Sequence, residues 1–128
     1  MSTLQSGCGC SCGSNNGPKL IFACSGCADV GELADQAARK LTRDGVGKMS
    51  CLAGIGGRIN GIVQSTETAQ SILAIDGCPL DCAKKTLENA GVPRVNHLRL
   101  SDLGFEKGKT AISAASIASV IDKAKFYL

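Results

Sequence analysis

Aromatic side chains are scarce in this sequence. It has no Trp, one Tyr and three Phe among 128 residues, yet hydrophobic residues make up 44% of the chain. The length is that of one domain, and 44% is enough to build a core. That core must therefore consist mainly of aliphatic side chains and alanine.

Long apolar runs are missing as well. Residues 1–18 contain no apolar stretch of the kind that a secretory signal peptide needs. No segment approaches the roughly 20 apolar residues of a membrane span. We therefore expect a cytoplasmic protein with no membrane contact.

A strong excess of one charge is also absent. The chain has 14 basic and 11 acidic residues, a net charge of +3, and no basic run interleaved with aromatics. Nucleic-acid partners are thus not expected. Histidine occurs once, as His97, and no cysteine is its evident partner. The sequence thus shows no Cys–His nucleophile pair, which argues against a hydrolase.

Cysteine is the abundant residue, with eight in the chain. In a secreted protein this number would predict a disulfide scaffold, but the chain otherwise has the pattern of an ordinary α/β protein. In a reducing cytosol, such a cysteine pattern more often indicates metal or redox chemistry.

Three of these cysteines, Cys8, Cys10 and Cys12, lie in a Gly- and Ser-rich segment. Its composition predicts a flexible tail over residues 1–18, joined to a domain over residues 19–128. Three ligands so close together would strain a tetrahedral metal site. The tail cysteines are either exposed thiols or ones that lend ligands to a metal or take part in thiol exchange.

Apolar runs alternate with helical patterns along the rest of the chain. We expect strands at 19–24, 47–53, 71–76 and 95–100. We expect a helix with a capping box of Asp29 and Glu32 that ends at Gly45. A loop at 54–57, a short helix within 58–70, a helix after residue 78 and a last helix from about Thr110 complete the pattern. This order predicts a single three-layer α/β domain: a mostly parallel four-stranded sheet, Rossmann-like in the order of its elements, with helices on both faces.

The central stretch runs from Ile75 to Lys85. An apolar strand leads into two thiols at the start of a helix. Pro79 suits the first helical position, which places Cys78 at the cap and Cys82 one turn later. The positive end of a helix favours thiolate, the form of cysteine that binds metal.

The cysteines outside the tail all follow predicted strands. In a parallel sheet the carboxyl ends of the strands share one edge, and neighbouring strands are about 4.8 Å apart. Turns at that edge can share one ion with Zn–S bonds near 2.3 Å. The predicted metal ligands are Cys24 and Cys27 after the first strand, Cys51 at the end of the second, and Cys78 and Cys82 after the third. For Cys51 a buried, apolar role is the alternative.

Three functions remain open from the thiols alone. Zn²⁺ suits four thiolates and needs no further chemistry, which makes a zinc-binding protein the leading interpretation. An iron–sulfur cluster uses the same ligands. A thiol/disulfide or persulfide-type redox protein is the third, although more thiols converge than a two-thiol cycle needs, so the pattern favours a binding protein over an enzyme.

Several charged residues lie near the thiols in the sequence and could support a metal site. Four thiolates on Zn²⁺ leave a net charge near −2, which Lys84, Lys85 and Arg58 could balance. Asp76 could cap the turn that follows it. For Asp76, Asp81 and His97, a structural role is the simpler interpretation than a metal-binding one.

The motif Asp76-Gly77-Cys78-Pro79-Leu80-Asp81-Cys82-Ala83 resembles the DGC domain family, as do residues 24–29 and 51–57. The resemblance covers roughly residues 19–110. It implies a small zinc-binding protein whose role is unknown, with four chelating cysteines. These would be Cys24, Cys27, Cys78 and Cys82, with Cys51 and the tail thiols in addition.

Overall fold

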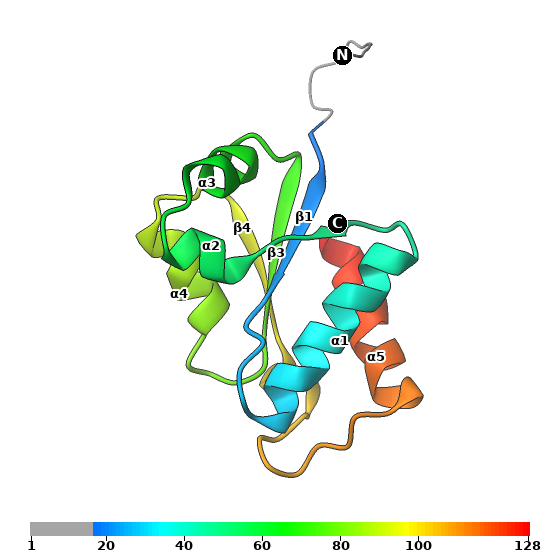
Figure 1. Ribbon diagram of the computed structural model, residues 1–128. Helices are drawn as coiled ribbons and strands as arrows, with labels where there is room; N and C mark the ends of the chain where they lie inside the picture. Colours follow the sequence, from blue (N-terminus) through cyan, green and yellow to red (C-terminus); the bar gives the residue numbers. More distant parts are fainter. Residues whose placement is uncertain (1–16) are drawn as a thin grey trace.

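A sheet of four parallel strands forms the centre of the computed structural model, which describes residues 17–128. The strands stand in the order β2-β1-β3-β4, and Figure 1 labels β1, β3 and β4 of them. Their bounds are Lys19–Ala23 (β1), Lys48–Met49 (β2), Ser71–Asp76 (β3) and Val95–Arg99 (β4). The predicted tail lies outside the described residues except for its last two, and with it Cys8, Cys10 and Cys12.

Helices cover both faces of this sheet, as Figure 1 shows. One face carries α1 (Asp29–Arg43) and α5 (Ala114–Ala124). The other carries α2 (Leu52–Gly56), α3 (Asn60–Glu67) and α4 (Cys82–Asn89). Two short 3-10 helices, η1 (Leu100–Leu103) and η2 (Lys125–Tyr127), follow β4 and α5. The predicted α/β architecture is confirmed.

The core is aliphatic, as the composition predicts. Successive residues of a strand point to opposite faces, so β1 contributes Ile21 to the core under α1 and Phe22 to the core under α4. Phe22 is the only aromatic residue among the buried hydrophobic residues of the described chain. No helix within residues 17–128 is long and apolar enough to cross a membrane.

The second strand is shorter than predicted. The sequence pattern predicts a strand at 47–53 and a loop at 54–57, but β2 ends at Met49 and α2 begins at Leu52. Cys51 causes the early start, because it is the N-cap of α2 and its Sγ accepts a hydrogen bond from the Gly54 N–H at 3.4 Å. A side chain that caps the helix offsets the low helix propensity of the glycines.

The predicted capping box at the start of α1 is wrong. Ala28 is the N-cap, and Asp29 is the first helical residue. The Asp29 carboxylate accepts hydrogen bonds from the backbone N–H groups of Gly108 and Thr110, each at 2.9 Å. It thereby ties the loop before α5 to the start of α1. That loop delays α5, which begins after a capping box of Ser113 and Ser116 rather than at Thr110.

Candidate metal centre

The carboxyl ends of β1 and β3 form the crevice of this fold. The two strands are paired in parallel, from Lys19 opposite Ser71 to Ala23 opposite Ile75. The chain leaves β1 toward α1 on one face and leaves β3 toward α4 on the other. Open α/β sheets bind ligands where neighbouring connections part in this way.

Glycines hold the loops after β1 and β3 close to α1. A Cβ atom on Gly31 would lie 2.6 Å from the backbone oxygen of Gly26. A Cβ atom on Gly77 would lie 2.7 Å from the backbone carbon of Val30. Real Cβ atoms do not approach so closely, so only glycine permits these backbone contacts.

Replacing Gly77 with Ala is therefore expected to lower the free energy of unfolding by about 1–3 kcal/mol, because the new methyl group overpacks against the α1 backbone. The matched control is Gly61→Ala in α3, where no atom lies within 4 Å of the added Cβ. That change is expected to stabilise the protein by up to about 1 kcal/mol. Urea unfolding of both variants measures the difference, and equal effects would contradict the packing argument.

Four of the predicted ligands line one pocket in this crevice. The pocket has a volume of about 220 Å³, and we call it the thiol pocket. Cys24 and Cys78 are partly buried there, whereas Cys27 and Cys82 are exposed, and all four are free thiols. The other lining residues with polar or large side chains are Asp76, Leu80 and Lys107. Within residues 17–128, no three cysteine sulfurs lie within 4.8 Å of one another.

Lys107 also lines the pocket, although no sequence pattern around it predicts a role there. It reaches the pocket because the backbone N–H groups of Gly108 and Thr110 are bound to Asp29, and these hydrogen bonds lower the pKa of that carboxyl. Two of the cations that we expected there are engaged elsewhere. Arg58 donates to the Asn89 backbone oxygen at 2.7 Å, and Lys84 pairs with Glu88 at 3.0 Å.

The helix after the thiols starts later than predicted. It begins at Cys82, with Asp81 as the N-cap in a left-handed conformation (φ 56°), so Cys78 and Pro79 belong to the preceding turn. The side chain that caps this helix is Asp76. Its Oδ1 accepts from the Ala83 N–H at 2.7 Å and its Oδ2 from the Lys84 N–H at 3.1 Å. A carboxylate from the strand end thus satisfies the first turn of α4.

Residues of β4 complete this polar cluster. His97 Nε2 lies 2.9 Å from Asp76 Oδ2 and 3.6 Å from Asp81 Oδ1. Arg99 donates to both oxygens of Asp81, from Nε at 2.8 Å and from a terminal nitrogen at 2.6 Å. The hydrogen bonds from Arg99 lower the pKa of Asp81 despite some burial, and the nearby His97 adds to the effect.

Asp76, Asp81 and His97 are also the only three possible metal ligands of residues 17–128 whose atoms all lie within 4.8 Å of one another. Both carboxylates are already engaged, Asp76 by two backbone N–H groups and Asp81 by a bidentate guanidinium. A cation beside Asp81 opposes a second cation at the same place. The arrangement therefore fixes the Cys78–Cys82 loop between two strands.

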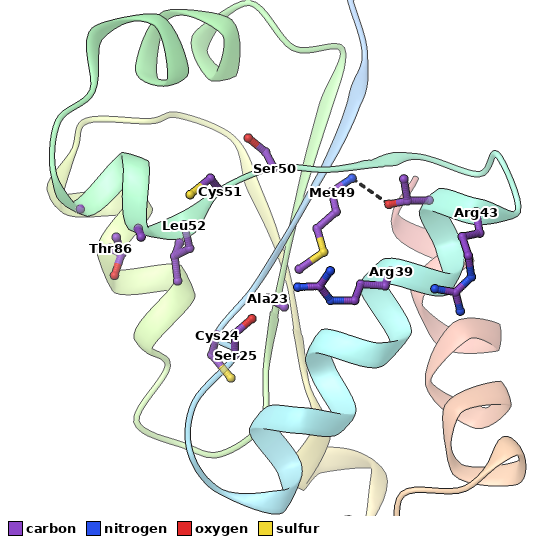
Figure 2. Close-up of a pocket in the computed structure, with 13 residues that line it drawn as sticks. Ala23, Cys24, Ser25, Arg39, Arg43, Met49, Ser50, Cys51, Leu52 and Thr86 are labelled. Carbon is purple, nitrogen blue, oxygen red and sulfur yellow. Dashed lines mark hydrogen bonds between the residues drawn. The ribbon is translucent and has the colours of Figure 1, made fainter.

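Cys51 lies apart from the thiol pocket. It lines a larger cleft of about 1090 Å³ at the carboxyl ends of β1 and β2, between α1 and α2 (Figure 2). We call this the arginine cleft, because Arg39 and Arg43 are the charged residues that line it within the described part of the chain. Cys24 lines both cavities. The structure thus brings four predicted ligands to the thiol pocket and places the fifth, Cys51, in the adjacent arginine cleft.

A small network holds Arg39 at the rim of this cleft. Its Nε donates to Asp35 Oδ2 at 2.5 Å, and the Ser25 hydroxyl donates to Asp35 Oδ1 at 2.7 Å. Burial raises the pKa of Asp35, but the hydrogen bonds from Arg39 and Ser25 lower it by more, so the pKa falls below its usual value.

Asp35 is consequently expected to add stability that depends on pH. A lowered folded-state pKa stabilises the protein above about pH 4 and loses this contribution as the pH falls through that pKa. Asp35→Asn is expected to cost up to about 1 kcal/mol near neutral pH and almost nothing in acid. The control is Asp44→Asn, whose partner Lys40 is 47% exposed. Urea unfolding across acid and neutral pH measures both, and a cost independent of pH would contradict the assignment.

Two comparisons relate this chain to known proteins. The family model of the DGC domain matches residues 20–124. A Pseudomonas aeruginosa protein named anaerobic and virulence modulator AnvM is 43% identical over 88 residues, which are 69% of this chain and 67% of that protein. No solved structure matches the chain.

Proposed function

Because the chain belongs to the DGC domain family, we propose that it is a zinc-binding protein, with one Zn²⁺ held by Cys24, Cys27, Cys78 and Cys82. The observation that carries the proposal is the thiol pocket. Two loops that are far apart in the sequence bring four thiols, which are soft ligands that suit zinc, to one cavity of about 220 Å³.

The donor set fits the ion. Zn²⁺ takes four thiolates in tetrahedral geometry with Zn–S bonds near 2.3 Å. Binding requires the four sulfurs to turn toward a common centre by rotation about their Cα–Cβ bonds. Lys107 lines the pocket and offsets part of the negative charge of four thiolates. Cys51 is the spare ligand of the five, because it faces the arginine cleft instead.

The ion would join the loop after β1 to the loop after β3. Each loop buries few side chains, since Cys27 in the first and Leu80 in the second are exposed. Zinc bound across them orders both, and its loss loosens both. We propose a regulatory use of this coupling, in keeping with the name of the relative, a modulator. The cytoplasm suits the five free thiols of the described chain.

Elemental analysis of protein purified without oxygen tests the proposal, together with an absorption spectrum of the same sample. The expected result is about one zinc per chain and no visible colour. Iron with acid-labile sulfide would overturn the proposal in favour of an iron–sulfur protein. A metal-free protein with a reversible disulfide would overturn it in favour of a dithiol redox protein.

A further inference from the structure

The arginine cleft is much larger than the thiol pocket and has a different chemistry. Its volume of about 1090 Å³ lies just above the usual range for small-molecule sites, which reaches about 1,000 Å³. Its floor is the end of β1 and β2, at Ala23 and Met49, and its walls are α1 and α2. It lies at the edge of the sheet where α/β proteins bind ligands.

The charge of the cleft is positive. Arg39 and Arg43 lie one turn apart on α1, and none of the lining residues from the described part of the chain carries a carboxylate. Asp35 engages Nε of Arg39 from the rim, which leaves the terminal nitrogens of that guanidinium available to a ligand. In Figure 2 the Arg39 side chain reaches from α1 toward the ends of the strands. Within residues 17–128, Arg43 has no acidic partner within salt-bridge distance. Two such guanidinium groups recognise a ligand that carries carboxylates.

The cleft also contains an exposed free thiol. This is the thiol of Cys51, at the start of α2. The Gly54 N–H donates a hydrogen bond to its sulfur at 3.4 Å, which holds the side chain in place. Of the five cysteines in the described chain, it alone lines the arginine cleft without also lining the thiol pocket. A ligand held by the arginines would therefore meet the exposed sulfur of Cys51, while the partly buried Cys24 is shared with the thiol pocket.

We propose that the arginine cleft binds a small disulfide whose organic groups carry carboxylates, and that Cys51 exchanges with it. The Cys51 thiolate, its proton lost to solvent, attacks one sulfur of the disulfide. A new S–S bond forms between Cys51 Sγ and that sulfur, the old S–S bond breaks, and the other sulfur leaves as a thiolate. One disulfide replaces another, so no further oxidant is needed. The inference stands beside the zinc proposal and requires only that Cys51 is not a zinc ligand.

Oxidised glutathione, which is acidic, and cystamine, a cationic disulfide of similar reactivity, are the probes. The full chain is treated with each at low ionic strength, digested with trypsin without reduction, and analysed by mass spectrometry. Cleavage after Lys48 and Arg58 releases Cys51 as the only cysteine of the peptide 49–58. The expected result is a glutathione adduct on this peptide that forms faster than the cystamine adduct.

The decisive variant is Arg39→Gln combined with Arg43→Gln. It is expected to slow the glutathione reaction of Cys51 roughly tenfold and to leave the cystamine reaction as fast or faster, because the attraction of the cleft for anions is lost. The charge control is Lys123→Gln on α5, an exposed lysine outside the cleft, which should change neither rate. The peptide 1–19, with Cys8, Cys10 and Cys12, is an internal reference whose reaction should not depend on the arginines.

Equal rates of the arginine variant and the parent with glutathione would overturn the inference, as would equal rates of the two disulfides with the parent. Cys51→Ser must lose the adduct on peptide 49–58, and zinc content is measured on every sample. Cys27→Ser separates the two proposals, because Cys27 lines only the thiol pocket and its loss should remove zinc and keep the Cys51 adduct. Loss of zinc in Cys51→Ser would instead identify Cys51 as a metal ligand. That result would overturn the inference about disulfide exchange but would still support a metal site.

Discussion

Replacing Cys78 with Ser is expected to abolish zinc binding and to remove the stability that zinc confers. A serine hydroxyl nearly matches the thiol in size but is a far poorer ligand for Zn²⁺ than a thiolate. When free zinc exceeds its dissociation constant a thousandfold, binding stabilises the folded protein by about 4 kcal/mol, and the variant should lose this amount. The thermal midpoint with and without added zinc, together with elemental analysis, measures the loss.

Two controls make this result specific. Cys51→Ser should keep the ion, because Cys51 lies in the arginine cleft rather than in the thiol pocket. The combined variant Cys8→Ser, Cys10→Ser and Cys12→Ser should keep it as well, since the thiol pocket offers four ligands without these three. Full retention of zinc in Cys78→Ser would contradict the assignment of the ligands.

Replacing Asp76 with Ala is expected to be the most damaging change outside the thiols, at about 3–5 kcal/mol of folding free energy. The carboxylate is only 1% exposed and accepts hydrogen bonds from two N–H groups of α4, with His97 as a third partner. Its removal leaves these buried groups without an acceptor, and each such loss costs about 1–3 kcal/mol. Denaturant unfolding of the zinc-free protein measures the effect independently of the metal.

Asp122→Ala is the matched control, because Asp122 is an exposed carboxylate on α5 with no hydrogen bond to the described chain. It should change the free energy of unfolding by less than about 0.5 kcal/mol. Asp76→Asn should fall between the two, since an amide oxygen keeps one acceptor for α4. If Asp76→Ala were as mild as Asp122→Ala, the capping role of Asp76 would be refuted.

Much of the fold follows from local pattern. The apolar runs at 19–24 and 71–76 form β1 and β3 almost at their predicted bounds, because central parallel strands are apolar on both faces. Alternation with helical segments leads directly to a parallel sheet. The expectation that the thiols after β1 and β3 share one edge is met by a single pocket.

The element boundaries depend on contacts that no local pattern reveals. Pro79 favoured a helix start next to Cys78, but Asp76 reaches past the turn and caps a helix that begins at Cys82. Similarly, Asp29 and Glu32 have the spacing of a capping box, yet Asp29 binds a loop some eighty residues away in sequence. In both cases a tertiary hydrogen bond replaced the local one.

The residues that surround the thiols could not be predicted from local sequence patterns either. His97 and Arg99 meet Asp76 and Asp81 only because β4 pairs with β3 in a register that sets Ala74 opposite His97 and Asp76 opposite Arg99. Lys107 arrives on a loop whose position depends on Asp29. Arg39 looks like any surface residue of an amphipathic helix until the strand order places an open cleft beside it.

The pairing of β1 with β3 has a consequence for the unfolded chain. Between these neighbours the chain makes α1, β2, α2 and α3, so the two halves of the thiol pocket are remote along the polypeptide. A zinc ion that joined Cys27 to Cys78 would close a loop of about 50 residues, and in the chain-entropy description a cross-link of that length restricts the denatured ensemble by roughly 4 kcal/mol. The first pair of cysteines also leaves the ribosome well before the second, so a complete tetrahedral site can form only after β3 has been synthesised.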